Sequence, residues 1–215
     1  PDVPKEAFVN VVQAIAAYLV ESGMFSEEVS QSITEIDWEA VLSSEAPEPT
    51  TNSIEEWLVW LGESLVEGGM SEQAAHVAAL ATSLAMRAFF ERPASDVMQI
   101  VNEIEEARDA HSMKCPVCGS SPTLSVVGGE TSSSGRGRRL FCQQCGTAWE
   151  FDRVRCARCG TRDQTKLHFF NVEGDESHRI ATCEECGNYI RVTYVDNNLQ
   201  PICFDVEDVL MGRLD

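Results

Sequence analysis

Eight of the nine cysteines in this chain form four Cys-x-x-Cys pairs, and their regular spacing limits the fold more than any other feature. The pairs are Cys115/Cys118, Cys142/Cys145, Cys156/Cys159 and Cys183/Cys186. Twenty-three residues separate the first pair from the second, and 23 separate the third from the fourth. Every cysteine of the last two pairs lies 41 residues after its counterpart in the first two. This repeat predicts two tandem modules with four cysteines each.

A glycine follows the second cysteine of every pair, and this is typical of a metal-binding turn. The glycines are Gly119, Gly146, Gly160 and Gly187. Glycine permits the positive φ that such a tight turn requires, so both thiolates of a pair can point at one ion. Two turns supply four sulfurs in a tetrahedron, which suits zinc or rubredoxin-type iron. We therefore predict that all eight paired cysteines are metal ligands, with one zinc or iron ion per module.

Other roles for these cysteines fit the pattern less well. Disulfides belong mainly to exported proteins, and no secretory signal is evident in the sequence. Thioredoxin-like redox pairs occur at helix starts after a strand, and four of them in one chain would be unusual. Whether the metal sites are purely structural or have a further function stays open.

The grouping of the four pairs has two alternatives. In the sequential one, the first pair joins the second and the third joins the fourth. In the other, the two inner pairs meet across only ten residues, which leaves the outer pairs to each other. The repeat favours the sequential grouping, because a duplicated module should carry its own complete site.

The segments between the cysteine pairs predict short strands. They are residues 123–127, 138–141 and 147–151 in the first module and 165–172, 178–182 and 188–195 in the second. These segments are rich in β-branched and aromatic residues and are separated by turn residues. A module of about 40 residues is too small to hold a core without help, so metal binding is expected to supply much of its folding free energy.

Charge and cysteine content divide the chain into two halves. Residues 1–110 contain four Lys/Arg and 21 Asp/Glu, a net charge of −17, whereas residues 111–215 contain 12 and 14. All the cysteines lie in the second half. We predict a helical domain over 1–112, a first ribbon over 113–154, and a second ribbon with a C-terminal segment over 155–215. The fold class is therefore α+β: an all-α N-terminal domain followed by two rubredoxin-like or zinc-ribbon modules.

Apolar periodicity predicts the helices of the first half. They are residues 5–21, a helix from Ser26 through Val41, a helix after the capping Ser53, and residues 72–91 after Ser71. Pro93 is expected to interrupt the last of these, with Asp96 capping a further helix. Residues 43–52 read as an acidic loop.

Several single residues have both a functional and an ordinary interpretation. The four histidines, His76, His111, His168 and His178, are surplus to complete four-cysteine sites, so we expect packing or surface roles. Trp149 is expected to cover the first metal site. Cys203, in an apolar run, is expected to be a small buried hydrophobe. Six arginines form a basic patch for which a solvated surface is the ordinary interpretation: Arg136, Arg138, Arg139, Arg153, Arg155 and Arg158.

Export, membrane insertion and catalysis find no support in the sequence. Residues 74–90 are mostly apolar, but they are short for a membrane span and include His76 and Arg87. No signal-peptide pattern is evident, and free thiolates suit a reducing compartment, so we expect a cytoplasmic location. We find no nucleophile–base set, phosphate loop or paired carboxylates at telling spacing, and we expect a protein that is not an enzyme.

The second half resembles formate dehydrogenase accessory proteins of the FdhE type. The motifs are CPVCGSSPTLSVV (115–127), CGTAWEFDRVRCARCG (145–160), LHF (167–169), CEECGNYIR (183–191) and DVLMGRLD (208–215). The resemblance implies a cytoplasmic maturation factor, or chaperone, with a helical domain and two rubredoxin-like or zinc-ribbon modules. It also implies that the eight paired cysteines bind metal and that the partner is the catalytic subunit of formate dehydrogenase. Iron has been associated with the family's sites.

Two other functions remain as alternatives. A zinc-ribbon protein that binds nucleic acid would use the arginine patch, but a net charge of −19 opposes phosphate binding. A rubredoxin-like redox protein would cycle iron at one of its sites. We expect no nucleic-acid partner.

Overall fold

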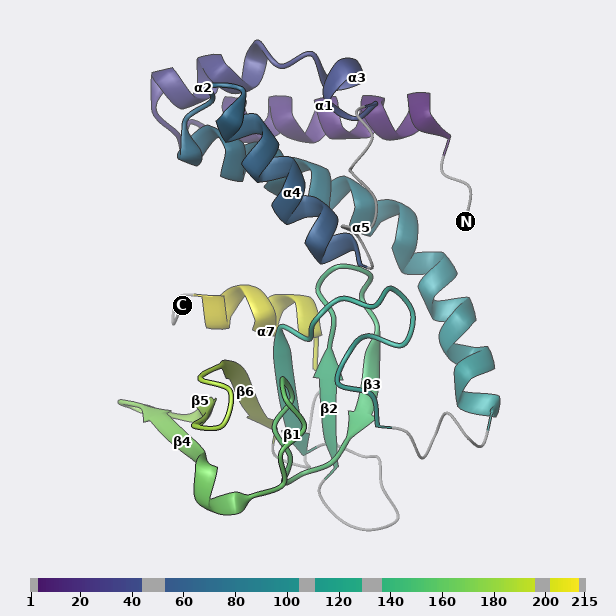
Figure 1. Ribbon diagram of the computed structural model, residues 1–215, viewed down its shortest axis with the longest axis vertical. Coiled ribbons are helices and arrows are strands. Elements are labelled where there is room, and N and C mark those ends of the chain that lie inside the picture. Colours follow the sequence, from purple (N-terminus) through teal and green to yellow (C-terminus); the bar gives the residue numbers. More distant parts are fainter. Residues whose placement is uncertain (1–3, 44–52, 105–110, 129–136, 196–201, 213–215) are drawn as a thin grey trace. The chain divides into compact units, whose positions relative to one another are not determined.

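The computed structural model describes residues 4–43, 53–104, 111–128, 137–195 and 202–212. It divides into two compact units, Pro1–Pro93 and Ala94–Asp215. The first contains helices and the second is built on a β-sheet, which confirms the predicted α+β class (Figure 1). The predicted acidic loop lies almost wholly outside the described residues. No helix in the described part of the chain has the length and apolar character needed to cross a bilayer.

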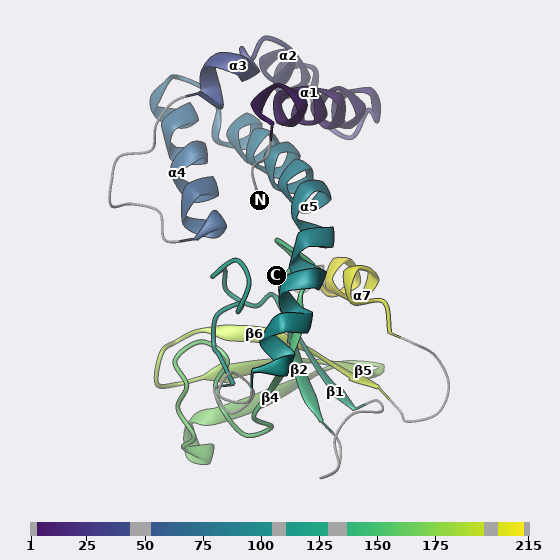
Figure 2. The ribbon, with the colours of Figure 1, turned by 90° about the vertical axis from the view of Figure 1, so that its right-hand side faces the viewer.

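The helices of the first unit enclose an apolar core. They are α1 (Lys5–Glu21), α2 (Glu27–Thr34), α3 (Trp38–Val41), α4 (Ile54–Glu67) and α5 (Glu72–Glu103), the last of which continues past Pro93. Buried side chains of α1, α2 and α3 pack against the alanine-rich first half of α5 (Figure 2). Ser26, Ser53 and Ser71 each accept a backbone hydrogen bond at a helix start, at 3.2–3.3 Å. Serine at this position satisfies a backbone N–H that the helix leaves unpaired.

The predicted helix from Ser26 through Val41 is wrong, because the segment divides into α2 and α3. α2 ends at Thr34, and Asp37 begins α3 by accepting a hydrogen bond from the backbone nitrogen of Ala40 at 3.0 Å. A capping aspartate competes with helix continuation. The break places Trp38, which is 5% exposed, in the core of the unit.

The predicted interruption at Pro93 is also wrong. α5 continues through Pro93 to Glu103, so Asp96 lies inside the helix and does not cap one. Proline removes one backbone hydrogen bond, and the turns on both sides remain helical. The division between the compact units falls after Pro93, earlier than the predicted domain boundary at residue 112.

The second unit contains one six-stranded sheet. Its strands are β1 (Leu124–Gly128), β2 (Arg138–Phe141), β3 (Ala148–Phe151), β4 (Leu167–Val172), β5 (Asp175–Cys183) and β6 (Tyr189–Val195), with a 3₁₀ turn at Gln164–Lys166 before β4. The order across the sheet is β3-β2-β1-β6-β5-β4. Each module therefore contributes three consecutive strands in an antiparallel meander, close to the predicted segments.

The two meanders join through a parallel pair that the sequence analysis did not predict. β1 pairs with β6 from Leu124 opposite Arg191 to Gly128 opposite Val195. The first strand of one module thus lies beside the last strand of the other. The predicted separation into ribbons 113–154 and 155–215 stays a prediction, but the two segments share a single sheet.

Helix α7 (Phe204–Met211) packs against the middle of this sheet, beside β1 and β6. Met211 is fully buried with Leu124, Val126 and Phe141. The Phe204 ring stacks on that of Phe141, with 5.2 Å between the centroids. α7 therefore closes one face of the sheet.

Candidate metal centres

The eight paired cysteines form two separate clusters. Cys115, Cys118, Cys142 and Cys145 make one, and Cys156, Cys159, Cys183 and Cys186 make the other. Within each cluster all sulfurs lie within 4.8 Å of one another. This is the sequential grouping. It follows because each meander folds its two cysteine turns toward each other.

The sulfur spacing fits a tetrahedral ion. Four sulfurs about 2.3 Å from zinc would lie about 3.8 Å apart. In the second cluster the distances Cys156–Cys186 and Cys159–Cys183 are both 3.8 Å, and the two corresponding distances in the first cluster are 3.5 Å. These separations far exceed a disulfide bond, and all nine cysteines are free. Each cluster can therefore hold one metal ion.

The local backbone of each turn prepares the thiols for a cation. The glycines after the second cysteines have φ values from 68° to 80°, as the sequence predicts. In the third turn, the backbone nitrogens of Arg158 and Cys159 donate to Cys156 Sγ at 3.4 and 3.5 Å. Donors aimed at sulfur favour the thiolate.

The thiols in a cluster share protons unequally. Hydrogen bonding from Cys115 lowers the pKa of Cys145 to about 7, whereas hydrogen bonding to Cys115 raises the pKa of Cys142. In the second cluster burial raises the pKa of Cys156, but the two backbone donors outweigh it and the value falls to about 7. Four neighbouring thiolates repel one another, so a cation is what allows all of them to be deprotonated together.

The two centres differ in solvent exposure. Three cysteines of the first cluster are buried, and Cys118 is half-buried. In the second cluster Cys159 is exposed and Cys186 half-buried. Solvent therefore reaches the second centre more readily.

A polar network links the two modules, and the sequence analysis missed it. Asp152 lies at its centre: its carboxylate is 2.8 Å from His111 Nδ1, 3.3 Å from Arg155 Nη1 and 2.7 Å from Arg162 Nη2. Arg155 also donates to the backbone oxygens of His111 and of Gly160 in the third cysteine turn. The only sequence sign was the run of charges between the modules.

Arg138 is part of the same junction rather than of a solvated patch. It is 7% exposed and donates to Ser125 Oγ at 2.7 Å and to the backbone oxygen of Arg155 at 2.7 Å. Burial lowers its pKa to about 10. The guanidinium groups of Arg138 and Arg155 both lie over the Phe151 ring. Arg136 lies outside the described residues, and Arg153 is exposed.

The remaining candidate residues lie outside the clusters of sulfur ligands. His168 pairs with Glu184, and His178 contacts both Asp175 and Glu207. His76 is exposed on α5. Trp149 is buried and donates from Nε1 to the Ser112 oxygen at 2.7 Å, while its predicted cover of the first centre stays a prediction.

The expectation that Cys203 is buried is wrong. Cys203 is exposed and precedes the first residue of α7. Its neighbours Ile202 and Phe204 pack against the core of the sheet unit. Because the chain turns into a helix at this point, neighbours in sequence face different surroundings.

Comparisons with known proteins match the cysteine-rich half. Residues 114–153 match the family model described as the FdhE central domain. A Protein FdhE homolog from Cronobacter sakazakii is 36% identical over 101 residues, 45% of this chain and 31% of that protein. Protein FdhE from Escherichia coli O9:H4 is 29% identical over 100 residues, with the same coverage.

A longer match and one solved structure extend the comparison. A Protein FdhE homolog from Shewanella baltica is 28% identical over 137 residues, 64% of this chain and 43% of that protein. The matched part of this chain thus spans about a third to two fifths of these relatives. The crystal structure of the FdhE protein from Pseudomonas aeruginosa aligns with 100% of this chain and 92% of its own, at 15% identity and a TM-score of 0.45.

Proposed function

We propose that this chain, which matches the FdhE central domain over residues 114–153, is a metal-binding accessory protein for formate dehydrogenase maturation. It would bind the enzyme's catalytic subunit in the cytoplasm and would not itself be an enzyme. The observation that carries the proposal is a pair of complete four-cysteine clusters, the first of which lies within residues 114–153, the segment that matches the FdhE central domain.

The eight cysteines would each supply one thiolate, with one zinc or iron ion per cluster. A bound ion would hold the two cysteine turns of each meander together and so keep the sheet folded. The sheet unit would then present a docking surface. The first half of the chain, with its net charge of −17, would contribute a second, acidic contact.

Copurification tests the proposal. Tagged protein, prepared anaerobically with zinc or iron, is mixed with the apo catalytic subunit. We expect a stable complex with the parent protein and its loss with Cys142→Ser, which removes a ligand of the first centre. Cys203→Ser is the matched control, because Cys203 lies outside both clusters. Absence of any complex under these conditions would overturn the proposal.

A rubredoxin-like redox role is the second candidate, favoured by the exposure of Cys159. Electron transfer requires iron, which would colour the protein red, whereas zinc would leave it colourless. Elemental analysis with a reduction titration separates the two. Full maturation activity with zinc alone would exclude the redox role.

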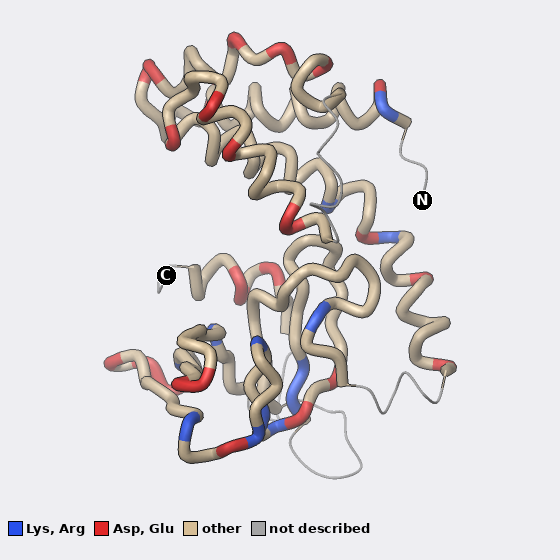
Figure 3. The backbone as a smooth tube through the Cα atoms, viewed as in Figure 1, with Lys and Arg blue, Asp and Glu red and all other residues tan. Residues whose placement is uncertain are grey.

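Binding of nucleic acid is less well supported than the sequence suggested. Arg138 is buried and Arg155 is committed to the link between the modules. Most of the Lys and Arg residues lie on the sheet unit, but the acidic residues outnumber them over the chain (Figure 3). Retention on DNA or RNA that weakens with salt would revive this function.

A further inference from the structure

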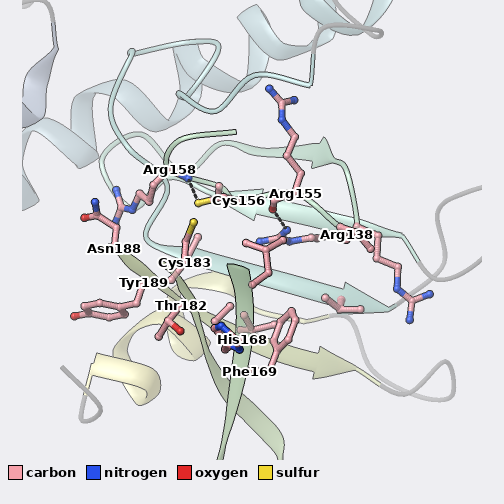
Figure 4. A pocket seen from close by; sticks show the side chains of 18 of the residues that line it. Arg138, Arg155, Cys156, Arg158, His168, Phe169, Thr182, Cys183, Asn188 and Tyr189 are labelled. Carbon is pink, nitrogen blue, oxygen red and sulfur yellow. Dashed lines mark hydrogen bonds between the residues drawn. The ribbon is translucent and has the colours of Figure 1, made fainter. Parts of the chain in front are cut away.

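The sheet face opposite α7 carries a pocket with no assigned role. Side chains of β6 alternate between the two faces: Arg191 contacts Asp208 of α7, whereas Val192 lines the pocket. The pocket has a volume of about 320 Å³ and lies between strands β1, β4, β5 and β6 and the linker at residues 153–158 (Figure 4). This size is within the range of ligand-binding sites.

The lining is apolar with a cationic margin. Its apolar surface includes Phe169, Tyr194 and Val154, of which Phe169 is 50% exposed and Val154 46% exposed. Four arginines also line it: Arg138, Arg153, Arg155 and Arg158. No described Asp or Glu does so. Cys156 and Cys183 of the second cluster also line the pocket, and Arg155 is paired with Asp152, so the positive charge left for a ligand comes mainly from Arg153 and Arg158. These two arginines favour an anionic group beside an apolar one.

Two of these arginines have capacity for a ligand. Arg138 and Arg155 already donate to backbone oxygens. Arg153 is exposed. Arg158 Nε is buried and has no hydrogen-bond partner among the described residues. A buried donor without a partner costs free energy, which a bound carboxylate would relieve.

Strand β4, at the margin of the pocket, points to an extended peptide as the ligand. One edge of β4 pairs with β5. The outer edge of β4 has no partner strand in the described structure. β1 is the counterpart of β4 in the 41-residue repeat, and the same edge of β1 accepts β6 in parallel. Exposed apolar edge strands recruit additional strands, and Phe169 and Phe170 of β4 are both exposed.

We propose that this pocket and the outer edge of β4 form a docking site for an extended acidic–apolar segment of a partner protein. The segment pairs with the outer edge of β4 as β6 pairs with β1. Its apolar side chains pack against Phe169, and one of its carboxylates binds Arg158. A second copy of this chain does not match the charge preference of the pocket, since its exposed β4 edge is itself flanked by arginines of the pocket, and self-association is measured below as the competing outcome. The docking site rests on the proposed function in one respect only: the segment is taken to belong to the protein that the accessory protein assists.

A display library of random 12-residue peptides, selected on the metal-loaded full chain, tests the site. We expect enriched sequences that combine Asp or Glu with β-branched or aromatic residues. The strongest peptide should lose about tenfold in affinity with Arg158→Gln, as expected for one charge-assisted hydrogen bond, and a comparable amount with Phe169→Ser. Arg92→Gln, an exposed arginine of α5, is the matched control. Metal content is measured for each variant to confirm that both centres are intact.

Backbone pairing has its own test. N-methylation of alternate peptide bonds should abolish binding, because it removes donors to the β4 edge. No enrichment, enrichment of basic peptides, unchanged affinity in both pocket variants, or retained binding after N-methylation would each overturn the site. Concentration-dependent self-association that Arg158→Gln abolishes would also overturn it, in favour of a second copy.

The failure of this proposal can be told from failure of the proposed function. If the peptides do not bind but the dehydrogenase subunit still copurifies with Arg158→Gln, the docking site is wrong and the accessory function stands. If acidic peptides bind and the subunit never copurifies, the accessory function is wrong and the binding site stands.

Discussion

At the residue scale, two positions of the sheet unit are constrained by close approach to backbone atoms. Gly128, with φ 109°, ends β1 beside β6, and a Cβ built there would lie 2.1 Å from the backbone oxygen of Val195. Arg138 donates to the backbone oxygen of the linker residue Arg155 from a buried position. The neighbour in each case is a backbone atom, which cannot rotate away as a side chain can, so both positions tolerate little change.

Gly128→Ala is expected to destabilise the sheet unit by roughly 3 kcal/mol, because it combines an unfavourable positive φ with a clash against backbone. Gly174→Ala is the matched control: its φ is 75°, but nothing lies within 4 Å of the added Cβ. That variant should cost about 1 kcal/mol. Urea unfolding of the metal-loaded proteins measures both. Equal losses would contradict the close approach of β1 and β6.

Arg138→Met is expected to cost about 3 kcal/mol in the free energy of unfolding, because it leaves buried acceptors without a donor. Arg138→Lys should recover only part of this loss, since one ammonium cannot reproduce the directions of a guanidinium. Thermal unfolding compares these variants with Arg153→Gln, an exposed neighbour in the linker. If Arg138→Met unfolds at the same temperature as Arg153→Gln, the proposed link between the modules is wrong.

At the element scale, α7 is fastened to the sheet by charged side chains. Arg191 of β6 donates to the backbone oxygen of Asp208 at 2.7 Å and lies 2.8 Å from its carboxylate. His178 of β5 lies between Asp175 and Glu207, with Nδ1 2.6 Å and Nε2 3.0 Å from their carboxylates. Glu207 also accepts from Thr193 of β6. Two strands of the second meander thus hold a helix that also packs on β1.

The His178 contacts predict a pH dependence of stability. Burial lowers the pKa of His178, but hydrogen bonds to Asp175 and Glu207 outweigh it and raise the pKa above 6.5. Protonation therefore favours the folded state. The stabilisation is complete below the unfolded pKa, near 6.5, and is lost as pH rises through the higher folded value.

Urea unfolding of the parent protein and His178→Gln at pH 6 and pH 8.5 measures this contribution. The parent should exceed the variant in unfolding free energy by more at pH 6 than at pH 8.5. His76→Gln, which changes an exposed histidine of α5, should show no such difference. An equal gap between parent and His178→Gln at both pH values would contradict the prediction.

At the scale of the whole molecule, the two four-cysteine clusters belong to modules that share one sheet, while the helices of the first unit have their own core. Because β1 and β6 pair in parallel, loss of the ion at one centre is expected to affect the strands of the other module. Each structural zinc site contributes on the order of 10 kcal/mol to folding. Removal of metal is therefore expected to destabilise the whole second unit and to leave the stability of the first unit unchanged.

The double variant Cys159→Ser with Cys186→Ser should bind one ion per chain in place of two. Loss of the second centre frees β6, so amide hydrogens of β1 should exchange faster although β1 belongs to the other module. Amides of α1 should exchange at the parent rate. Elemental analysis and hydrogen exchange measure these outcomes, with Cys203→Ser as the control that keeps both ions. Unchanged protection of β1 would show that the two modules fold independently.

The sequence by itself determined the short-range features of this protein. The Cys-x-x-Cys-Gly spacing predicted the cysteine turns. Enrichment in β-branched and aromatic residues predicted the strands, and apolar residues at the helical period predicted α1. These features depend on residues close together in the chain, where local geometry leaves few choices. Resemblance of the same motifs also pointed to the FdhE family, whose central-domain model matches residues 114–153.

Tertiary structure alone decided the rest. β1 pairs with β6, more than 60 residues later in the chain, and both strands bury side chains against α7. No local sequence pattern predicts this pairing. α5 continues through Pro93 because the flanking turns remain helical, and Cys203 is exposed because the chain turns into α7 there. Arg138 was expected on the surface, but it is buried at a junction where its hydrogen-bond partners, Ser125 and Arg155, come from both modules. Burial is a property of the assembled fold, so residues of the same type in one sequence run end in different environments.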